Sequence, residues 1–246
     1  MAATHGGATG KSPLAGMVSA RFVRVMLNQA FRCDAVPPEL MDRLWASGWR
    51  HFGSTFFRYS HSPDADGVRT ITPLRLDLDR FEPSRSQRRV RRRNADLHWA
   101  FAPASLSDEA RALFEIHKTR FKDNVPDDLD TFLSTDPAHV PCTCVECRVH
   151  LPDGRLIALS YLDVGAQATS AVYGVFDPAF ARRSLGIFTM LLEIEHSRAL
   201  GCRHYYPGYA TTEPSPYDYK KQFAGLEQLD WQGGHWRPLA LNPNPT

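Results

Sequence analysis

The sequence has little of what marks a membrane-spanning or secreted protein. No apolar run among its 246 residues reaches the length that a membrane span needs. Residues 1–10 are polar and rich in glycine, and they lack the apolar core of a signal peptide. We therefore expect no membrane partner.

Cysteine is scarce as well, and the chain carries almost no excess of charge. Five cysteines are an odd number and are unevenly placed, which disfavours a disulfide framework and favours a reduced, cytoplasmic protein. A net charge of +2 by itself says nothing about a polyanionic partner. With 43% hydrophobic and 11% aromatic residues, the chain can bury a core of ordinary globular size.

The order of hydrophobic patterns predicts the α+β class with a mixed sheet. The first half predicts a helix over 37–45 ending at Gly48, an aromatic strand over 49–59, a loop over 61–66 and a strand over 70–78. A short helix capped by Ser84 or Ser86, a strand over 97–102, a helix from Ser107 and a short helix over 127–133 follow. The second half predicts strands over 144–149, 156–164 and 170–176, a long helix capped by Ser184 and ended at Gly201, a strand over 204–208, and a tail from Trp236.

Positive charge is concentrated in one run, residues 80–93, which holds seven arginines and a single carboxylate, Glu82. This density is sufficient for salt-sensitive binding to a phosphate backbone. The alternative is a solvated basic helix or a degradation or localisation signal. The candidate phosphate-binding residues are Arg85, Arg88, Arg89, Arg92 and Arg93.

A second constellation surrounds the start of the long helix. A strand, a turn and a helix N-terminus present free N–H groups and a positive dipole end, so Arg183, Ser184 and Gly186 are candidates to bind an anionic group. The alternative is an ordinary crossover helix with surface arginines. Beyond the next strand, tyrosine faces could stack on an unpaired RNA end, with lysines near its phosphates. These residues, which could instead form an amphipathic rim of the core, are Tyr206, Tyr209, Tyr217, Tyr219, Lys220 and Lys221.

Cysteines 142, 144 and 147 with His150 suggest a zinc ligand set. However, a strand over 144–149 would turn Cys144 and Cys147 to opposite faces, so buried thiols are the expectation and no metal or other cofactor is predicted. His117, on an apolar helix face, is expected to be a core histidine.

With these motifs in view, the chain resembles the aminoacyl-tRNA–protein transferases of the N-degron pathway, which include arginyltransferases and bacterial leucyltransferases that act on acidic N-termini. The resemblance covers residues 40–238. It is carried by Gly48-Trp-Arg-His-Phe-Gly53, Phe57-Arg58, Pro83 to Val90, Arg92 to Asp96, Asp163-Val164, Ala171-Val-Tyr173, Phe176-Asp-Pro178, Ala181 to Gly186, Tyr206 to Tyr209, Tyr219-Lys220 and Phe223.

The resemblance implies a GNAT-like mixed sheet flanked by helices, without acetyl-CoA as donor, and a smaller N-terminal α/β portion. We accordingly expect disordered residues 1–16, an N-terminal region with the tRNA-binding segment over 17–96, the transferase domain over 97–238 and a tail over 239–246. The partners implied are aminoacyl-tRNA and proteins that begin with Asp or Glu. Gly208 joins the candidate substrate-binding residues with the motif that contains it.

Two departures from the family pattern stand out. Family members carry cysteines linked to iron–sulfur or zinc binding where residues 59–66 have none, which puts a metal cluster in doubt. The family's Cys-Pro-Lys-Met is replaced by Pro214-Ser-Pro-Tyr217, which puts acceptor specificity in doubt.

The implied reaction is attack by an acceptor α-amine on the ester of aminoacyl-tRNA, with arginine or leucine as the donor. Positioning should dominate the rate, and Asp163, Asp177 and Asp218 are the candidate general bases. One alternative is a GNAT-type N-acetyltransferase, disfavoured because Phe188 would obstruct a pyrophosphate at the helix start. The other is a catalytically inert tRNA- or RNA-binding module.

Overall fold

The computed structural model describes residues 27–64, 67–122, 125–215 and 218–239, so the predicted disorder of 1–16, Tyr217 and nearly all of the tail lie outside the described residues. The helices are α1 (Pro38–Ala46), α2 (Arg85–Arg93), α3 (Asp108–Lys118), α4 (Leu185–Ala199) and the short 3-10 helices η1 (Leu129–Thr131), η2 (Pro178–Arg183) and η3 (Asp218–Gln222). The strands are β1 (Asn28–Arg32), β2 (Arg50–Phe52), β3 (Thr55–Tyr59), β4 (His61–Asp64), β5 (Gly67–Asp77), β6 (His98–Pro103), β7 (Cys144–His150), β8 (Leu156–Val164), β9 (Ala168–Phe176), β10 (His204–Thr211), β11 (Leu226–Asp230) and β12 (His235–Pro238).

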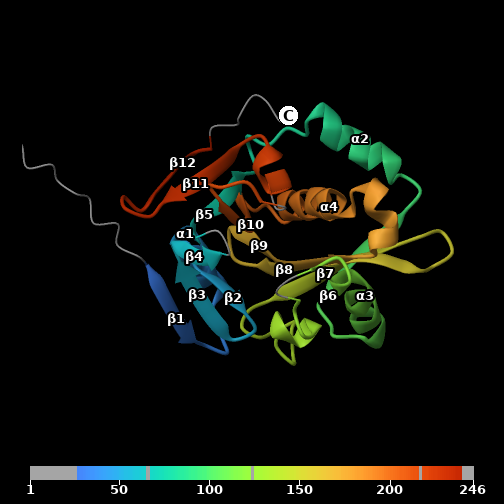
Figure 1. The fold of residues 1–246 in the computed structure, drawn as a ribbon, viewed down its shortest axis with the longest axis horizontal. Coiled ribbons are helices and arrows are strands. Elements are labelled where there is room, and N and C mark those ends of the chain that lie inside the picture. Colours follow the sequence, from blue (N-terminus) through green and yellow to red (C-terminus); the bar gives the residue numbers. More distant parts are fainter. Residues whose placement is uncertain (1–26, 65–66, 123–124, 216–217, 240–246) are drawn as a thin grey trace, which may run out of the picture.

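A nine-stranded mixed sheet forms the centre of the protein, in the order β12-β11-β5-β10-β9-β8-β7-β6, with β4 paired to β5 (Figure 1). Neighbouring strands in this sheet are antiparallel except β9 and β10, which are parallel and are joined by the crossover helix α4. The predicted α+β class with a mixed sheet flanked by helices is confirmed. None of the helices in the described residues has both the length and the apolar character needed to cross a bilayer.

Helices cover both faces of this sheet. Figure 1 shows α4, with α2 outside it, on one face and α3 on the other. On the α4 face, Leu185, Phe188 and Leu192 pack against Val149 and Ile157. On the α3 face, the core includes Leu113, Phe114, Leu159 and Tyr161. The β8 residues are almost all buried because both of their faces are covered.

A smaller three-stranded sheet, β1-β3-β2, lies beside the large one. The aromatic segment 49–59, predicted as one strand, is therefore a hairpin. Gly53, with φ +49°, permits the tight turn between its two strands. The predicted loop over 61–66 contains strand β4, which tolerates Pro63 because it is an edge strand paired only with β5.

Other local predictions fare better. Helix α1 begins next to Pro37 and ends just before Gly48, as its prolines and glycine predict. Helix α2 starts at a capping box in which the Ser84 side chain accepts from Gln87 N and the Gln87 side chain accepts from Ser84 N. The predicted helix over 127–133 shrinks to the single turn η1, and β11 and β12 were not predicted.

The large sheet contains strands from both sides of residue 96, the predicted end of the N-terminal region. Strand β5, from the predicted N-terminal region over 17–96, pairs with β10 on one side and β11 on the other. The N-terminal segment therefore supplies a central strand of the same sheet that carries α4.

Candidate active site between two diverging parallel strands

The parallel pairing of β9 with β10 is short, and a cavity opens where it ends. Only three residue pairs join these strands, Ala168–Ser170 with His204–Tyr206. Beyond them β10 bulges between Tyr205 and Gly208 and continues along β5. A cavity of about 510 Å³ lies there, lined by residues 171–176 of β9 and 207–211 of β10.

Several further segments complete the cavity wall. They are the β2–β3 hairpin, single residues of β5 and β8, the end of α3 with the segment that follows it, the first three turns of α4, and η3. Much of the wall is aromatic, and the rings of Phe132 and Tyr173 stack at 3.8 Å. The aromatic lining residues are Phe52, Phe57, Tyr59, Phe121, Phe132, Tyr173, Phe176, Tyr205, Tyr209 and Tyr219.

Two cations converge at Gly208. A Cβ built on this glycine would lie 3.6 Å from Lys220 Nζ and 3.8 Å from an Arg50 guanidinium nitrogen. Gly208 has φ +100°, a backbone conformation that residues with a Cβ rarely adopt. Arg50 also donates hydrogen bonds to Ser170 Oγ and to the Ala171 carbonyl, at the point where β9 and β10 separate.

Burial changes the acid–base behaviour of these cations. It lowers the pKa of Arg50, and it lowers the pKa of Lys220 to about 8, an effect to which the positive charge of Arg50 adds. Lys220 is therefore a cation at neutral pH that titrates close to the physiological range.

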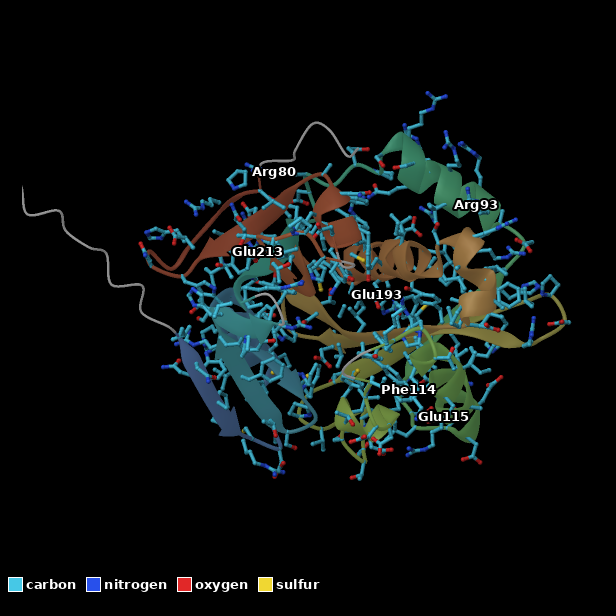
Figure 2. All side chains as sticks on the ribbon, viewed as in Figure 1. Arg80, Arg93, Phe114, Glu115, Glu193 and Glu213 are labelled. Carbon is cyan, nitrogen blue, oxygen red and sulfur yellow. The ribbon has the colours of Figure 1, made fainter. Side chains whose placement is uncertain are left out.

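Glu193 is the sole carboxylate among the described residues that line the cavity. It lies on α4 with 2% of its surface exposed, and it accepts a hydrogen bond from the Tyr205 hydroxyl. Burial raises its pKa to about 7, although Tyr205, Lys220 and Arg50 favour the charged form. Figure 2 shows Glu193 in the interior, between α4 and the large sheet.

A histidine at the end of α3 and an arginine just beyond this helix also reach the cavity. His117 is buried, as predicted for a core histidine, and its Nδ1 accepts from the Phe176 N–H at 3.0 Å. Burial lowers its pKa to about 4, so it is neutral at pH 7. Arg120 is exposed, and its guanidinium lies 4.9 Å from the centre of the Phe176 ring.

The three candidate bases lie outside the cavity lining. Asp163 is buried, and its Oδ2 is 2.7 Å from His51 Nε2. Asp177 caps η2 by accepting from Ala179 N. Asp218 forms an ion pair with Lys221 at 2.8 Å and accepts from Ser215.

The candidate substrate-binding residues divide into two groups. Gly186, Gly208, Tyr209, Tyr219 and Lys220 line the cavity together. Tyr206, by contrast, is buried in the cluster that contains Trp45 and Phe56, on the other side of β10.

Arg183 and Ser184 line a separate shallow hollow with Arg93, Ala181 and Arg182. Arg183 is already paired with Asp96, at 2.8 and 2.9 Å.

Ser184 does not cap α4 with its side chain, so that prediction is wrong. The residue adopts a left-handed conformation, with φ +56°, and its side chain makes no capping hydrogen bond. Its backbone carbonyl instead accepts from Phe188 N at 3.0 Å.

Phe188 does not obstruct the start of α4, contrary to the prediction. Its ring is 3% exposed and packs with Val90, Leu97 and Leu192 in the core. It therefore does not project toward the start of α4.

Most arginines of α2 face outward, and the helix packs beside α4. Five of them, Arg85, Arg88, Arg89, Arg92 and Arg93, are exposed, whereas Gln87 and Val90 are buried. Arg91 is held by the Glu195 carboxylate on α4.

At the end of α2, Arg93 donates to the Arg182 carbonyl and Asn94 donates to the Arg183 carbonyl at 2.9 Å. Figure 2 shows Arg93 at this end of α2. The basic helix thus reaches the segment that leads into Gly186 and the cavity.

Arg50 and Glu193 line the cavity but were not predicted as site residues from the sequence. Arg50 lies within the motif from Gly48 to Gly53, and Glu193 is one of the buried residues of α4. A carboxylate at a position surrounded by apolar residues was the available signal for Glu193.

Similarities to known proteins extend over most of the chain. The family model described as "Arginine-tRNA-protein transferase, C terminus" matches residues 110–230. An aspartate/glutamate leucyltransferase of Marinobacter nauticus is 32% identical over 216 residues, 84% of this chain and 85% of the relative. Another of that name, from Chromohalobacter salexigens, is 35% identical over 204 residues, 80% of this chain and 78% of the relative.

Solved structures show weaker likenesses. The C-terminal domain of a putative lysylphosphatidylglycerol synthetase from Agrobacterium fabrum matches 76% of this chain and 55% of that one, at 16% identity and a TM-score of 0.49. FemX matches 83% of this chain and 73% of that one, at 13% identity and a TM-score of 0.45. The fold assignment accordingly rests on the sheet topology.

Proposed function

This chain belongs to the aminoacyl-tRNA–protein transferase family of the aspartate/glutamate leucyltransferases, and we propose that it transfers leucine from charged tRNA to proteins beginning with Asp or Glu. The single observation that supports this most is the cavity where Arg50 and Lys220 converge at Gly208 beside an aromatic wall. We include in the proposal a cytoplasmic setting, consistent with five free cysteines.

The acceptor side chain is recognised by charge. Asp and Glu place a carboxylate a few bonds from the reacting α-amine. Arg50 and Lys220 offer several N–H donors in a half-buried setting, where charge-assisted hydrogen bonds are strong. Neutral side chains would make no charge-assisted hydrogen bond to these cations, and basic side chains would be repelled.

The same charges favour leucine over arginine as the donor. Among the described residues, the cavity lining has three cations, Arg50, Arg120 and Lys220, against one carboxylate. An arginyl side chain would add a fourth positive charge, whereas a leucyl side chain fits the surface formed by Phe52, Phe132 and their aromatic neighbours.

The reaction forms an amide bond and breaks an ester bond. The acceptor amine attacks the ester carbonyl, the C–N bond forms, and the tRNA 3′ oxygen leaves with a proton. The ester is already activated, so holding the amine and carbonyl in attack geometry can contribute about 7–11 kcal/mol.

Glu193 is the group best placed to take the amine's proton. Its pKa of about 7 leaves a substantial fraction ionised at neutral pH, and it can return the proton to the leaving oxygen. Asp163, Asp177 and Asp218 remain predictions, but they line no part of this cavity.

The tRNA is held by the exposed arginines of α2. These contacts neutralise phosphates and position the acceptor stem without reading bases. The separate hollow lined by Arg93, Arg182 and Ser184 lies two residues along the chain from Gly186, which lines the cavity, and the charged 3′ end would enter on this side.

The test is a transfer assay with purified full-length protein. Radiolabelled Leu-tRNA or Arg-tRNA is incubated with peptides that begin with Asp, Glu or Ala, and with N-acetylated Asp peptide as the control. We expect leucine to appear on the free Asp and Glu peptides only. Absence of transfer from either donor would contradict the proposal.

The same preparation distinguishes the rivals. Acetyl transfer from acetyl-CoA without aminoacyl transfer would identify an N-acetyltransferase. Salt-dependent tRNA binding that is equally strong for aminoacylated and free tRNA, with no transfer, would identify an RNA-binding module.

A further inference from the structure

Three buried side chains with metal-binding atoms meet at the junction of the two sheets, outside the cavity. They are His51 of β2, Cys142 in the segment before β7, and Asp163 of β8, each at most 5% exposed. One ligand atom from each lies within 4.8 Å of the other two. None of the three lines the cavity.

The hydrogen bonds of His51 orient it as a ligand. Its Nδ1 is 2.8 Å from the Gly53 carbonyl, which can only accept, so Nδ1 carries a proton. Nε2 is therefore the ring nitrogen that can coordinate a metal, and it faces Asp163. Metal-binding histidines characteristically donate their other N–H to a carbonyl or carboxylate in this way.

A fourth donor, Cys144, lies next to Asp163, although its sulfur is not one of the three mutually close ligand atoms. Cys144 is directly opposite Asp163 in the β7–β8 register, so the two side chains share a face of the sheet. Both thiols, Cys142 and Cys144, interact with the Asp163 carboxylate. The set thus offers one nitrogen, two sulfurs and one oxygen, ligands that suit tetrahedral zinc.

The arrangement does not fit a nucleophilic Cys–His–Asp triad. In such a triad the histidine lies between the thiol and the carboxylate. Here one histidine nitrogen faces Gly53 and the other faces Asp163, so neither is left to deprotonate Cys142. The surrounding Val36, Met41, Trp45 and Phe56 also keep the group away from substrates.

We propose that His51, Cys142, Asp163 and Cys144 bind a structural zinc ion that fastens the three-stranded sheet to the large sheet. Binding displaces the proton shared by His51 and Asp163 and the protons of the two thiols, leaving zinc coordinated by neutral imidazole, carboxylate and two thiolates. Cys147 takes no part, because it packs on the opposite face of β7, beneath α4.

The first test measures metal content. Full-length protein is produced in zinc-supplemented medium and assayed by mass spectrometry for elemental zinc. We expect one zinc per chain in the wild type, a large loss in Cys142→Ser and Asp163→Asn, and no loss in the matched control Cys147→Ser. Wild-type protein without zinc, or Cys142→Ser with full zinc, would overturn the proposal.

A second measurement on the wild type alone avoids dependence on variants that fail to fold. Cobalt(II) replaces zinc, and thiolate–cobalt charge-transfer bands with intense tetrahedral d–d bands are expected. Chelation should remove the bands and lower the Tm. Cobalt that gives only weak octahedral bands, or a Tm unchanged by chelator, would contradict the site. Neither readout depends on the transfer activity.

Discussion

The buried environment of Glu193 disfavours the ionised form of its carboxyl group. The pKa rises from the ordinary 4.5 to about 7 because the carboxyl is buried, so the folded state binds this proton more tightly than the unfolded state. The stability contributed by the neutral carboxyl is fully present below pH 4.5 and is lost as pH rises through 7. At full ionisation the shift corresponds to about 3 kcal/mol.

Glu193→Gln should therefore separate stability from activity. At pH 8–9 we expect its free energy of unfolding to exceed that of the wild type by about 1–3 kcal/mol. At pH 5 the two should agree closely, since the wild-type carboxyl is then neutral. Urea denaturation at both pH values checks this, and a gain that is equal at pH 5 would contradict it.

The same variant should lose transfer activity. Removal of a general base lowers kcat by about 10²–10⁴-fold, and positioning should sustain the remainder. Leu-tRNA affinity, measured by filter binding, serves as the control and should be unchanged. Full kcat in Glu193→Gln would exclude Glu193 as the base.

Lys220 tests the acceptor half of the site. Lys220→Met keeps the length of the side chain and removes its charge, so KM for an Asp-initiated peptide should rise about 10- to 100-fold. The matched control is Lys221→Met, on the same short helix, because Lys221 pairs with Asp218 and does not line the cavity.

The pH dependence of KM adds a second check on Lys220. Burial lowers its pKa to about 8, so its charge is present below pH 8 and is lost above it. Wild-type KM for acidic peptides should accordingly rise above pH 8, and this rise should be absent in Lys220→Met. A rise that persists in the variant would assign the effect to another group.

At the scale of elements, α2 carries its positive charge on the surface. Among its arginines, all of which the structure describes, Arg91 alone forms an ion pair within the protein. The triple change Arg88→Gln, Arg89→Gln and Arg92→Gln should weaken tRNA binding uniformly across sequences. The slope of log K against log salt should fall by about two to three. Glutamine substitution of three exposed arginines outside α2, Arg43, Arg203 and Arg237, is the control.

The start of α2 was predictable because its signal is local. Ser84 and Gln87 satisfy each other's backbone N–H groups within four residues. The start of α4 was not, since the left-handed Ser184 follows from how η2 and α2 pack against it. Edge strand β4 and the β2–β3 turn were missed for a similar reason, because pairing partners outweighed local propensity.

At the scale of the molecule, β5 joins the N-terminal segment to the transferase sheet. It separates β10 from β11, and Trp236 Nε1 donates to the Ala46 carbonyl at 2.9 Å from the far end of the chain. Fragment 97–246 would lack this strand and expose two unpaired sheet edges.

We expect fragment 97–246 alone to show no cooperative thermal unfolding and to aggregate. Co-expression with fragment 1–96 should restore a soluble complex with a cooperative transition. Circular dichroism during heating measures both, and an independently folded 97–246 would show that β5 is dispensable.

By itself, the sequence determined the family, the α+β class, the helices with local start and stop signals, and the basic character of α2. These follow from short-range patterns and from motifs that stand in a recognisable order. Only the tertiary structure decided that Arg50, Glu193 and Lys220 share one cavity, while Asp163 joins His51 and Cys142 in another place. The physical reason is that burial and convergence of charge depend on sheet order and strand divergence, which bring together residues more than a hundred positions apart.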